Sequence, residues 1–238
     1  MGTKWIEALN ELEMGRIGAQ IMCEQVAQKT ASVLLLPTGQ TPVTVYDCLA
    51  GLYRQGKLNW QSVHTVNLDE YASLPPTHPQ SYHAFMKKEL FDRVGLTKEQ
   101  TRLPRGDAPD LDAECHSYDR HIQELGGVDF ALLGVGHNGH IGFNEPGDSF
   151  SAGTHVVDLT PSTRQANARF FASIDEVPER AVTMGVEQIM QSRRILLLCG
   201  ADKREIVEAA FTGLVTPRNP VSVLRLHRHV TIVHCWRR

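Results

Sequence analysis

Residues 134–147, GVGHNGHIGFNEPG, place an imidazole, an amide and a carboxylate on one glycine-rich segment. Glu145 follows His140 by five residues, and Asn138 precedes it by two. Imidazole titrates near neutral pH, and a neighbouring carboxylate or amide can fix its tautomer, so this combination suits general acid–base catalysis. In the alternative interpretation, one of the two histidines of this segment only makes a hydrogen bond within the loop.

The same segment matches a dinucleotide-binding fingerprint, because the letters GVGHNG satisfy G-x-G-x-x-G and follow the apolar run 128–133. That fingerprint opens a helix and needs an acidic residue about 20 positions further on. Gly142 and Pro146 disfavour a helix here, and Asp158, near the required distance, falls in an expected strand at 156–159. The fingerprint alone is weak evidence, so we expect no nicotinamide or other cofactor.

A metal site is a third interpretation, built on His137, His140 and Glu145. The spacing of three between the histidines is possible for ligands, but it is not H-E-x-x-H, and no further Cys or His cluster lies near in sequence. We therefore expect no metal, and we leave His137 as a loop residue.

Asp69 is a second carboxylate that could do chemistry, because it directly follows the apolar strand expected at 64–68. A carboxylate in that position lies at the floor of a pocket rather than on an exposed helix. Glu70 should point elsewhere, since successive strand residues alternate. A structural role for Asp69, capping a loop, is an equally open interpretation.

The letters PTGQTP hold four residues that could bind an anion: Thr38, Gly39, Gln40 and Thr41. They precede a predicted helix, with Thr41 as its N-cap and Pro42 at its first position. Free N–H groups and the helix dipole favour a phosphate there, although a capped turn needs no ligand. Lys203 and Arg164 could add positive charge, or each could be an ordinary surface residue.

Short apolar runs alternate with longer segments of helical period, which indicates an α/β fold with a parallel sheet covered on both faces. The expected strands are 32–36, 64–68, 128–133, 195–199 and 230–233, and the expected helices are 11–29, one opening at 41–42, 81–93, 110–125 and 202–211. Ligands bind at the carboxyl ends of such strands. Four of these ends are polar or glycine-rich, so we expect PTGQT, DEY, GVGHNGH and GADK to form one pocket.

Composition limits the remaining classes of function. The 238 residues carry a net charge of −3, which gives no sign of a nucleic-acid or membrane-surface partner. No apolar run approaches the roughly 20 residues of a membrane span, and the charged first thirty residues do not resemble a secretion signal. Five scattered cysteines favour free thiols in a reducing compartment, so we expect a cytoplasmic protein.

These motifs, in this order, resemble the glucosamine-6-phosphate deaminase family. The resemblance rests on LPTGQTP, NLDEY, HPQSYHAFM, GDAPDLDAEC, GVGHNGHIGFNEPG, LTPSTRQANARFF and GADK, and it covers nearly the whole chain. It implies a single three-layer α/β domain over residues 1–238 with a Rossmann-like sheet. It also implies conversion of glucosamine 6-phosphate, an amino-sugar phosphate, into fructose 6-phosphate and ammonia without a cofactor, in amino-sugar catabolism.

The resemblance also implies roles for individual residues. His140 matches the residue that opens the sugar ring, Glu145 matches its carboxylate partner, and Asp69 matches the base that moves the C2 proton to C1. Asn138 stands where many members have Asp and others have Asn. An amide can orient the imidazole but cannot share its charge.

Three further expectations come from the same resemblance. The substrate phosphate should lie on residues 38–41 with Arg164 and Lys203, and segment 159–171 matches a mobile lid. Allosterically activated members carry basic residues where this chain has His155 and Val157, and they extend beyond its last residues. We therefore expect hyperbolic kinetics without activation by N-acetylglucosamine 6-phosphate, from a monomer or small homo-oligomer.

Two rival functions remain to be weighed. A 6-phosphogluconolactonase on the same fold has no need for a C2 proton acceptor, so it leaves Asp69 unexplained. A sugar-phosphate sensor would need a DNA-binding module, and neither a helix-turn-helix nor a basic segment precedes residue 30.

Overall fold

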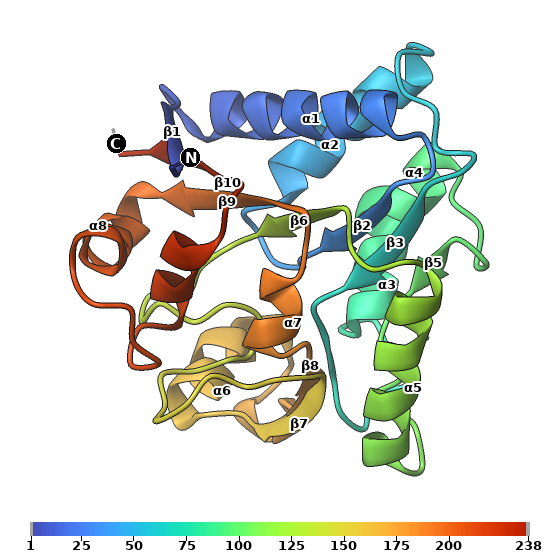
Figure 1. Ribbon diagram of the computed structural model, residues 1–238. Helices are drawn as coiled ribbons and strands as arrows, with labels where there is room; N and C mark the ends of the chain where they lie inside the picture. The colour runs from blue at the N-terminus through green and yellow to red at the C-terminus, as the bar shows by residue number, and fades with distance from the viewer. Residues whose placement is uncertain (1, 237–238) are drawn as a thin grey trace.

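A seven-stranded sheet forms the centre of the computed structural model, which describes residues 2–236 (Figure 1). Its strand order is β1-β10-β9-β6-β2-β3-β5, and every neighbouring pair is parallel. The strands are β1 Lys4–Glu7, β2 Val33–Leu36, β3 His64–Asn67, β5 Thr101–Arg102, β6 Phe130–Leu133, β9 Arg194–Gly200 and β10 Val230–Cys235. The α/β prediction is confirmed. Arg237 and Arg238, on which the expectation about the chain's last residues rests, lie outside the described residues.

Helices cover both faces of this sheet, which makes three layers. On β2 the side chains of Leu34 and Leu36 enter one hydrophobic cluster, whereas those of Val33 and Leu35 enter the other, as alternation along a strand requires. The first cluster is covered by α1 Glu11–Gln28, α2 Val43–Arg54 and the consecutive turns α3 Tyr82–Met86, η1 Lys87–Phe91 and α4 Asp92–Val94. The second is covered by α5 Leu111–Glu124, α7 Val186–Met190, α8 Arg204–Thr212 and η5 Pro220–Leu226.

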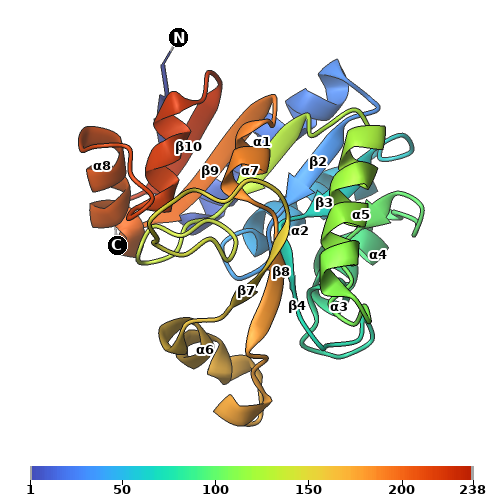
Figure 2. The same cartoon turned by 60° about the horizontal axis from the view of Figure 1, so that its bottom comes forward.

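A second sheet, of which the sequence predicted only the strand at 156–159, lies beyond the carboxyl end of β3 (Figure 2). It is antiparallel, in the order β4-β8-β7, with β4 Asp69–Tyr71, β8 Arg180–Thr183 and β7 His155–Asp158. It carries α6 Pro161–Asn167 and the turns η2 Ala168–Phe170 and η3 Ile174–Glu176. Asp69 therefore does not follow the last strand residue, as predicted, but is the first residue of a new strand at the junction of the two sheets.

Helix α2 also begins differently from the prediction. Pro42 is its N-cap, Val43 is its first residue, and the Thr41 side chain makes no capping hydrogen bond. The missing cap leaves N–H groups at the start of this helix without a side-chain acceptor.

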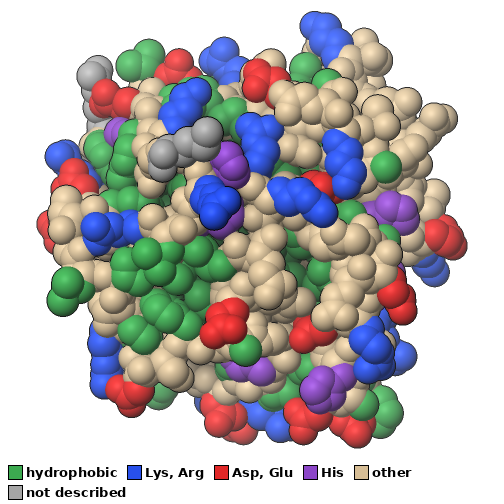
Figure 3. All heavy atoms as spheres, viewed as in Figure 1, with side chains coloured by type: hydrophobic (Ala, Val, Ile, Leu, Met, Phe, Trp, Pro, Cys, Tyr) green, Lys and Arg blue, Asp and Glu red, His purple; other side chains and the backbone are tan. Residues whose placement is uncertain are grey.

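The distribution of charged side chains on the surface is consistent with the low net charge, and the helices are consistent with the absence of long apolar runs in the sequence. Figure 3 shows acidic and basic side chains interspersed over one face of the molecule. Within residues 2–236, no helix combines the length and apolar character needed to cross a membrane.

Candidate active site

The loop after β6 holds His140, Asn138 and Glu145 in one hydrogen-bonded chain. The Asn138 amide nitrogen donates to Glu145 Oε2 at 2.6 Å, and Asn138 Oδ1 lies 2.8 Å from His140 Nδ1. A carboxylate only accepts, so the amide must direct its NH₂ to Glu145 and its oxygen to the imidazole. Nδ1 of His140 therefore carries a proton, and in the neutral ring Nε2 is left as the base.

Glu145 is the charged member of this hydrogen-bonded series. Burial raises the pKa of its carboxyl, but His140, Thr163 and Asn138 together outweigh that effect and lower the pKa to about 2. Glu145 Oε2 lies 3.6 Å from His140 Nδ1, and Thr163 donates its hydroxyl to Oε1 at 2.5 Å. The Glu145 carboxylate is therefore ionised near neutral pH.

Three glycines shape the loop, and this explains the spacing that resembles a dinucleotide fingerprint. A Cβ on Gly136 would lie 2.1 Å from the His140 ring. Gly139, at φ +86°, and Gly142, at φ +59°, have backbone conformations that other residues rarely adopt. The glycines let the chain turn back so that the imidazole lies against the backbone of Gly136.

Asp69 lies beside this loop. A Cβ built on Gly142 would be 3.5 Å from Asp69 Oδ2, and β4 and β8 pair Asp69 with Thr183, whose hydroxyl accepts from the N–H of Phe143. The Asp69 side chain is buried, with its residue only 6% exposed. Burial, and after it the charge of Glu70, raise its pKa to about 8. A buried carboxyl with a shifted pKa next to a catalytic loop is a candidate general base.

Glu70 points away from Asp69, as alternation along β4 predicts. Its carboxylate accepts hydrogen bonds from the N–H groups of Tyr71, Tyr82 and His83, and it lies 2.8 Å from His83 Nδ1. Glu70 thus ties the start of α3 to β4 and fixes the strand that carries Asp69.

The PTGQT turn is connected to this site through Tyr46 and Tyr82. The buried Tyr46 hydroxyl donates to the Pro37 carbonyl at 2.6 Å, and burial together with the Asp69 charge raises the pKa of Tyr46. Tyr82 shares a hydrogen bond with the Thr38 side chain, and its ring stacks on that of Phe143. These contacts link the turn after β2 to both Asp69 and the loop of His140.

The turn has free donors for an anion. Among the described residues, the backbone N–H groups of the four predicted phosphate-binding residues have no hydrogen-bond acceptor: Thr38, Gly39, Gln40 and Thr41. Gly39 has φ +97°, which bends the chain ahead of α2. Free N–H groups at a helix start form an anion-binding site.

The two predicted cations differ in position. Lys203 lies after β9, in the turn η4 Ala201–Lys203, and its Nζ is 2.7 Å from His137 Nε2 and 2.5 Å from Asp202 Oδ2. An ammonium group only donates, so Nε2 of His137, to which the sequence assigned no role, accepts this hydrogen bond. Arg164 lies on α6, where its guanidinium donates to the carbonyls of Ile174 and Val177 at 3.2 Å. It is held within its own segment rather than at the PTGQT turn.

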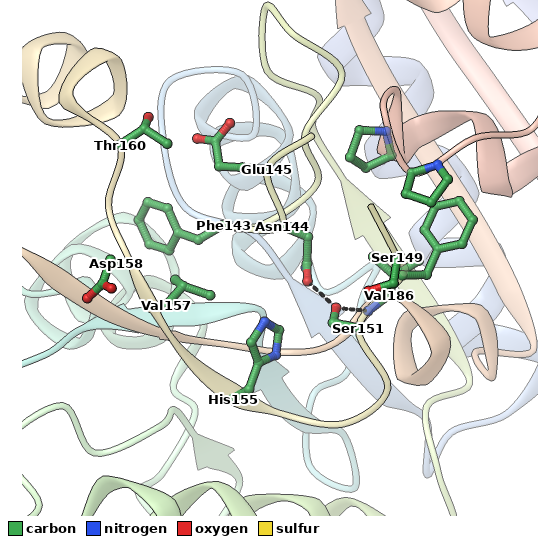
Figure 4. A pocket seen from close by; sticks show the side chains of 13 residues that line it. Phe143, Asn144, Glu145, Ser149, Ser151, His155, Val157, Asp158, Thr160 and Val186 are labelled. Atoms are coloured by element: carbon green, nitrogen blue, oxygen red, sulfur yellow. Dashed lines mark hydrogen bonds between the residues drawn. The ribbon is translucent and has the colours of Figure 1, made fainter. Parts of the chain in front are cut away.

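A cavity of about 310 Å³ lies behind Glu145, between the loop and β7 (Figure 4). Its walls include Glu145, His155, Asp158 and Thr160, together with apolar side chains. No Lys or Arg is among its described lining residues, and neither Asp69 nor His140 lines it. In residues 2–236 no group of three or more His, Cys, Asp or Glu side chains is arranged to hold a metal.

Thr163 and Tyr82 contact residues of the site, and neither was predicted from the sequence as a site residue. Thr163 binds Glu145 from 18 residues away, and Tyr82 reaches Thr38 from a separate helix. Neither contact leaves a spacing pattern in the sequence, so only the fold brings these side chains to the site.

A donor-rich turn, a buried carboxyl and an imidazole–carboxylate pair at the carboxyl edge of a parallel sheet define an α/β enzyme that moves protons on an anionic substrate. The family model for glucosamine-6-phosphate isomerases and 6-phosphogluconolactonases matches residues 12–233, and the chain belongs to this family.

Individual relatives are similar over nearly the full length. A glucosamine-6-phosphate deaminase of Lachnoclostridium phytofermentans is 48% identical over 98% of this chain and 99% of its own, and one of a Geobacillus species is 50% identical over 97% and 92%. A solved monomeric glucosamine-6-phosphate deaminase superposes with a TM-score of 0.94 at 44% identity, covering 98% of this chain and 97% of the other. The 6-phosphogluconolactonase of Trypanosoma cruzi, at 17% identity and a TM-score of 0.77, shares the fold over 98% and 94% of the two chains.

Proposed function

We propose that this chain converts glucosamine 6-phosphate into fructose 6-phosphate and ammonia, by deamination coupled to aldose–ketose isomerisation. The observation that carries the proposal is the buried Asp69 beside the loop of His140 and Glu145, with a phosphate-sized set of free N–H groups nearby. Relatives that are 44–50% identical over nearly the whole chain carry this activity in their names.

The substrate phosphate binds the N–H groups of residues 38–41, and Lys203 supplies positive charge. Arg164 approaches the phosphate when segment 159–171 closes over the bound sugar as a lid. Closure excludes water from the reactive intermediate. The exposed character of α6, in which no side chain is buried, supports a segment that can move.

His140 opens the pyranose ring as a proton shuttle: Nε2 takes the proton of the C1 hydroxyl and delivers it to the ring oxygen as the bond between C1 and that oxygen breaks. The Asn138 amide fixes the ring so that Nε2 is the nitrogen available for this transfer, and the Glu145 charge stabilises the imidazolium. The product of this step is the open-chain aldehyde.

Asp69 then removes the C2 proton, which the neighbouring C1 carbonyl makes acidic. The electrons of the C2–H bond form the C1=C2 double bond, and the C1 carbonyl oxygen takes a proton from the C2 ammonium group, which gives an enolamine. Return of the proton to C1 gives an imine at C2, and water then displaces ammonia and leaves the ketone of fructose 6-phosphate. The carbonyl of the substrate supplies the electron sink, so the chemistry requires no cofactor.

Lactone hydrolysis is the rival reaction within the same family. It attacks an ester carbonyl with water and leaves C2 untouched, so it gives no task to a buried base. Structural relatives named 6-phosphogluconolactonase are 17–20% identical to this chain and support only the shared fold.

A substrate comparison separates the two reactions. The wild-type chain should release ammonia and fructose 6-phosphate in equal amounts from glucosamine 6-phosphate, and it should leave 6-phosphogluconolactone at its spontaneous rate of hydrolysis. Rapid lactone hydrolysis without ammonia release from the amino sugar would reverse the assignment.

The assembly and location belong to the same proposal. The chain acts as a monomer or small homo-oligomer, in line with the monomeric relative, and it works in the cytoplasm, where phosphorylated sugars occur. Buried thiols that form no disulfide, such as Cys115 and Cys199, support a reducing compartment.

A further inference from the structure

One contact joins the lid segment to the catalytic carboxylate. Thr163, in the first turn of α6, donates its hydroxyl to Glu145 Oε1 at 2.5 Å. The other carboxylate oxygen, Oε2, accepts from Asn138. Both oxygens of Glu145 are therefore bound, one from its own loop and one from the lid.

The side-chain hydroxyls of this turn donate in sequence, from Thr160 to Thr163 and from Thr163 to Glu145. The Thr160 side chain caps α6 by accepting from the N–H of Thr163, and its hydroxyl donates to Thr163 Oγ1 at 3.0 Å. Thr163 thus accepts from Thr160 and can direct its only hydroxyl proton to Glu145. The capping of the helix orients the hydroxyl that binds the carboxylate.

Few other contacts hold this helix in place. None of the side chains of α6 is buried, and Arg164 donates to the carbonyls of Ile174 and Val177, which follow the lid segment. Phe171, after the helix, packs against the ring of Tyr71 at the other end. The bond between Thr163 and Glu145 is therefore a polar anchor that ties the first turn of α6 to the loop of His140.

We propose that Thr163 is a positioning residue that couples the seating of α6 to the orientation of the Glu145 carboxylate, and through Asn138 to His140. The inference rests on the function proposed above. When α6 is seated, Glu145 is held by two donors and keeps the amide and the imidazole aligned. When α6 swings away, Oε1 loses its donor, and the imidazole is no longer held in the productive position.

None of the charged or titratable groups around Glu145 can take the place of Thr163 as the hydrogen-bond donor to Oε1. His140 approaches from the same loop, and His155 and Asp158 of β7 line the cavity beside it. No Lys or Arg is among the described residues lining that cavity, so no cation there can replace the hydroxyl as a partner for Oε1.

The test compares Thr163→Val, which removes the hydroxyl at nearly constant shape, with Thr163→Ser, which keeps it. Ser173→Ala is the matched control, because Ser173 is an exposed hydroxyl of the same segment whose side chain makes no capping hydrogen bond. Thr163→Val should lower kcat about tenfold with little change in KM, because a charge-assisted hydrogen bond of this kind contributes on the order of 1.5 kcal/mol. Thr163→Ser and Ser173→Ala should stay within about twofold of the wild type.

A double variant identifies the route of the effect. If Thr163 acts through Glu145, adding Thr163→Val to Glu145→Gln should lower kcat no further. Additive losses, a wild-type kcat for Thr163→Val, or failure of Thr163→Ser to restore the rate would each overturn the proposal.

Hydrogen exchange of the free protein provides a readout that needs no substrate. Amides of residues 162–170 should exchange faster in Thr163→Val than in the wild type or in Thr163→Ser, because the helix loses its polar anchor. Equal exchange in all three would refute the anchor even if the chain proved to act on another sugar phosphate. A wild type that releases no ammonia would refute the proposed function and leave this result standing.

Discussion

Burial raises the pKa of the Asp69 carboxyl, which suits a general base but lowers the stability of the folded protein once the carboxyl ionises. Its carboxyl is buried at the junction of two sheets, and burial and Glu70 raise its pKa to about 8. The substrate carries an amino group at C2, next to the proton to be removed. A cationic amine at that position would lower the pKa of Asp69 on binding and so create the base where it is used.

The cost of this buried group should appear in the stability of the protein. The folded carboxyl has a pKa raised to about 8 from the ordinary 3.8, so between these pH values the folded state holds a proton that the unfolded state has lost. Stability therefore falls as pH rises through this window. The side chain of Asp69→Asn cannot ionise. The free energy of unfolding of this variant, relative to that of the wild type, should therefore rise by about 2–3 kcal/mol between pH 6 and pH 9.

Urea unfolding of both proteins at these two pH values measures the effect. Asp175→Asn, which removes an exposed carboxylate of the turn η3, is the matched control and should show no such growth. If the difference in the free energy of unfolding between Asp69→Asn and the wild type were the same at both pH values, the raised pKa of Asp69 would be contradicted.

At the scale of elements, the glycines of the loop after β6 make the sharpest test of how the imidazole is placed. A methyl group on Gly136 would meet the His140 ring at 2.1 Å, whereas nothing lies within 4 Å of a Cβ on Gly134. Gly136→Ala should therefore displace His140 and lower kcat on the order of a hundredfold, because a misplacement of about 1 Å can cost that much.

Gly134→Ala is the control for this substitution, two residues away in the same loop. It should keep kcat within about twofold of the wild type, and both variants should remain folded by circular dichroism. Equal activity of Gly136→Ala and Gly134→Ala would show that the ring of His140 does not depend on the backbone at Gly136.

The sequence predicted the elements whose pattern is strong. The strands that became β2, β6, β9 and β10 consist mainly of hydrophobic residues, and nearly every residue in them is buried, as a sheet covered on both faces requires. The polar segments at four strand ends also indicated where to look for a site. This part follows from rules that act over a few residues.

The second sheet could not be predicted in the same way. β4 has only three residues and is a continuation of β3, and β8 pairs with it from more than 100 residues away. A pairing at such a distance leaves no local period, so Asp69 was expected after a strand rather than in one. For the same reason the contacts of Thr163 and Tyr82 came only from the fold.

At the scale of the whole molecule, the cavity beside β7 bears on whether an activator can bind. His155 and Val157 line the cavity behind Glu145, and the described lining contains no Lys or Arg. A phosphorylated activator would need such cations. We therefore expect hyperbolic substrate curves that N-acetylglucosamine 6-phosphate leaves unchanged.

Initial rates over a range of glucosamine 6-phosphate, with and without the acetylated sugar at millimolar concentration, provide the check. Light scattering at the concentration of the assay gives the mass, which we expect to be that of one 26.5 kDa chain or a small multiple. A sigmoidal curve that the acetylated sugar makes hyperbolic would contradict this expectation.

The central claim is that Asp69 and the imidazole–carboxylate pair act on one bound amino-sugar phosphate, and the most direct measurement is the turnover of Asp69→Asn. We expect this variant to bind glucosamine 6-phosphate within a few-fold of the wild-type affinity, as measured by calorimetry. Its release of ammonia and fructose 6-phosphate should fall on the order of a hundredfold or more, because the base for the C2 proton is gone. Release at the wild-type rate would contradict the account and remove Asp69 from the reaction.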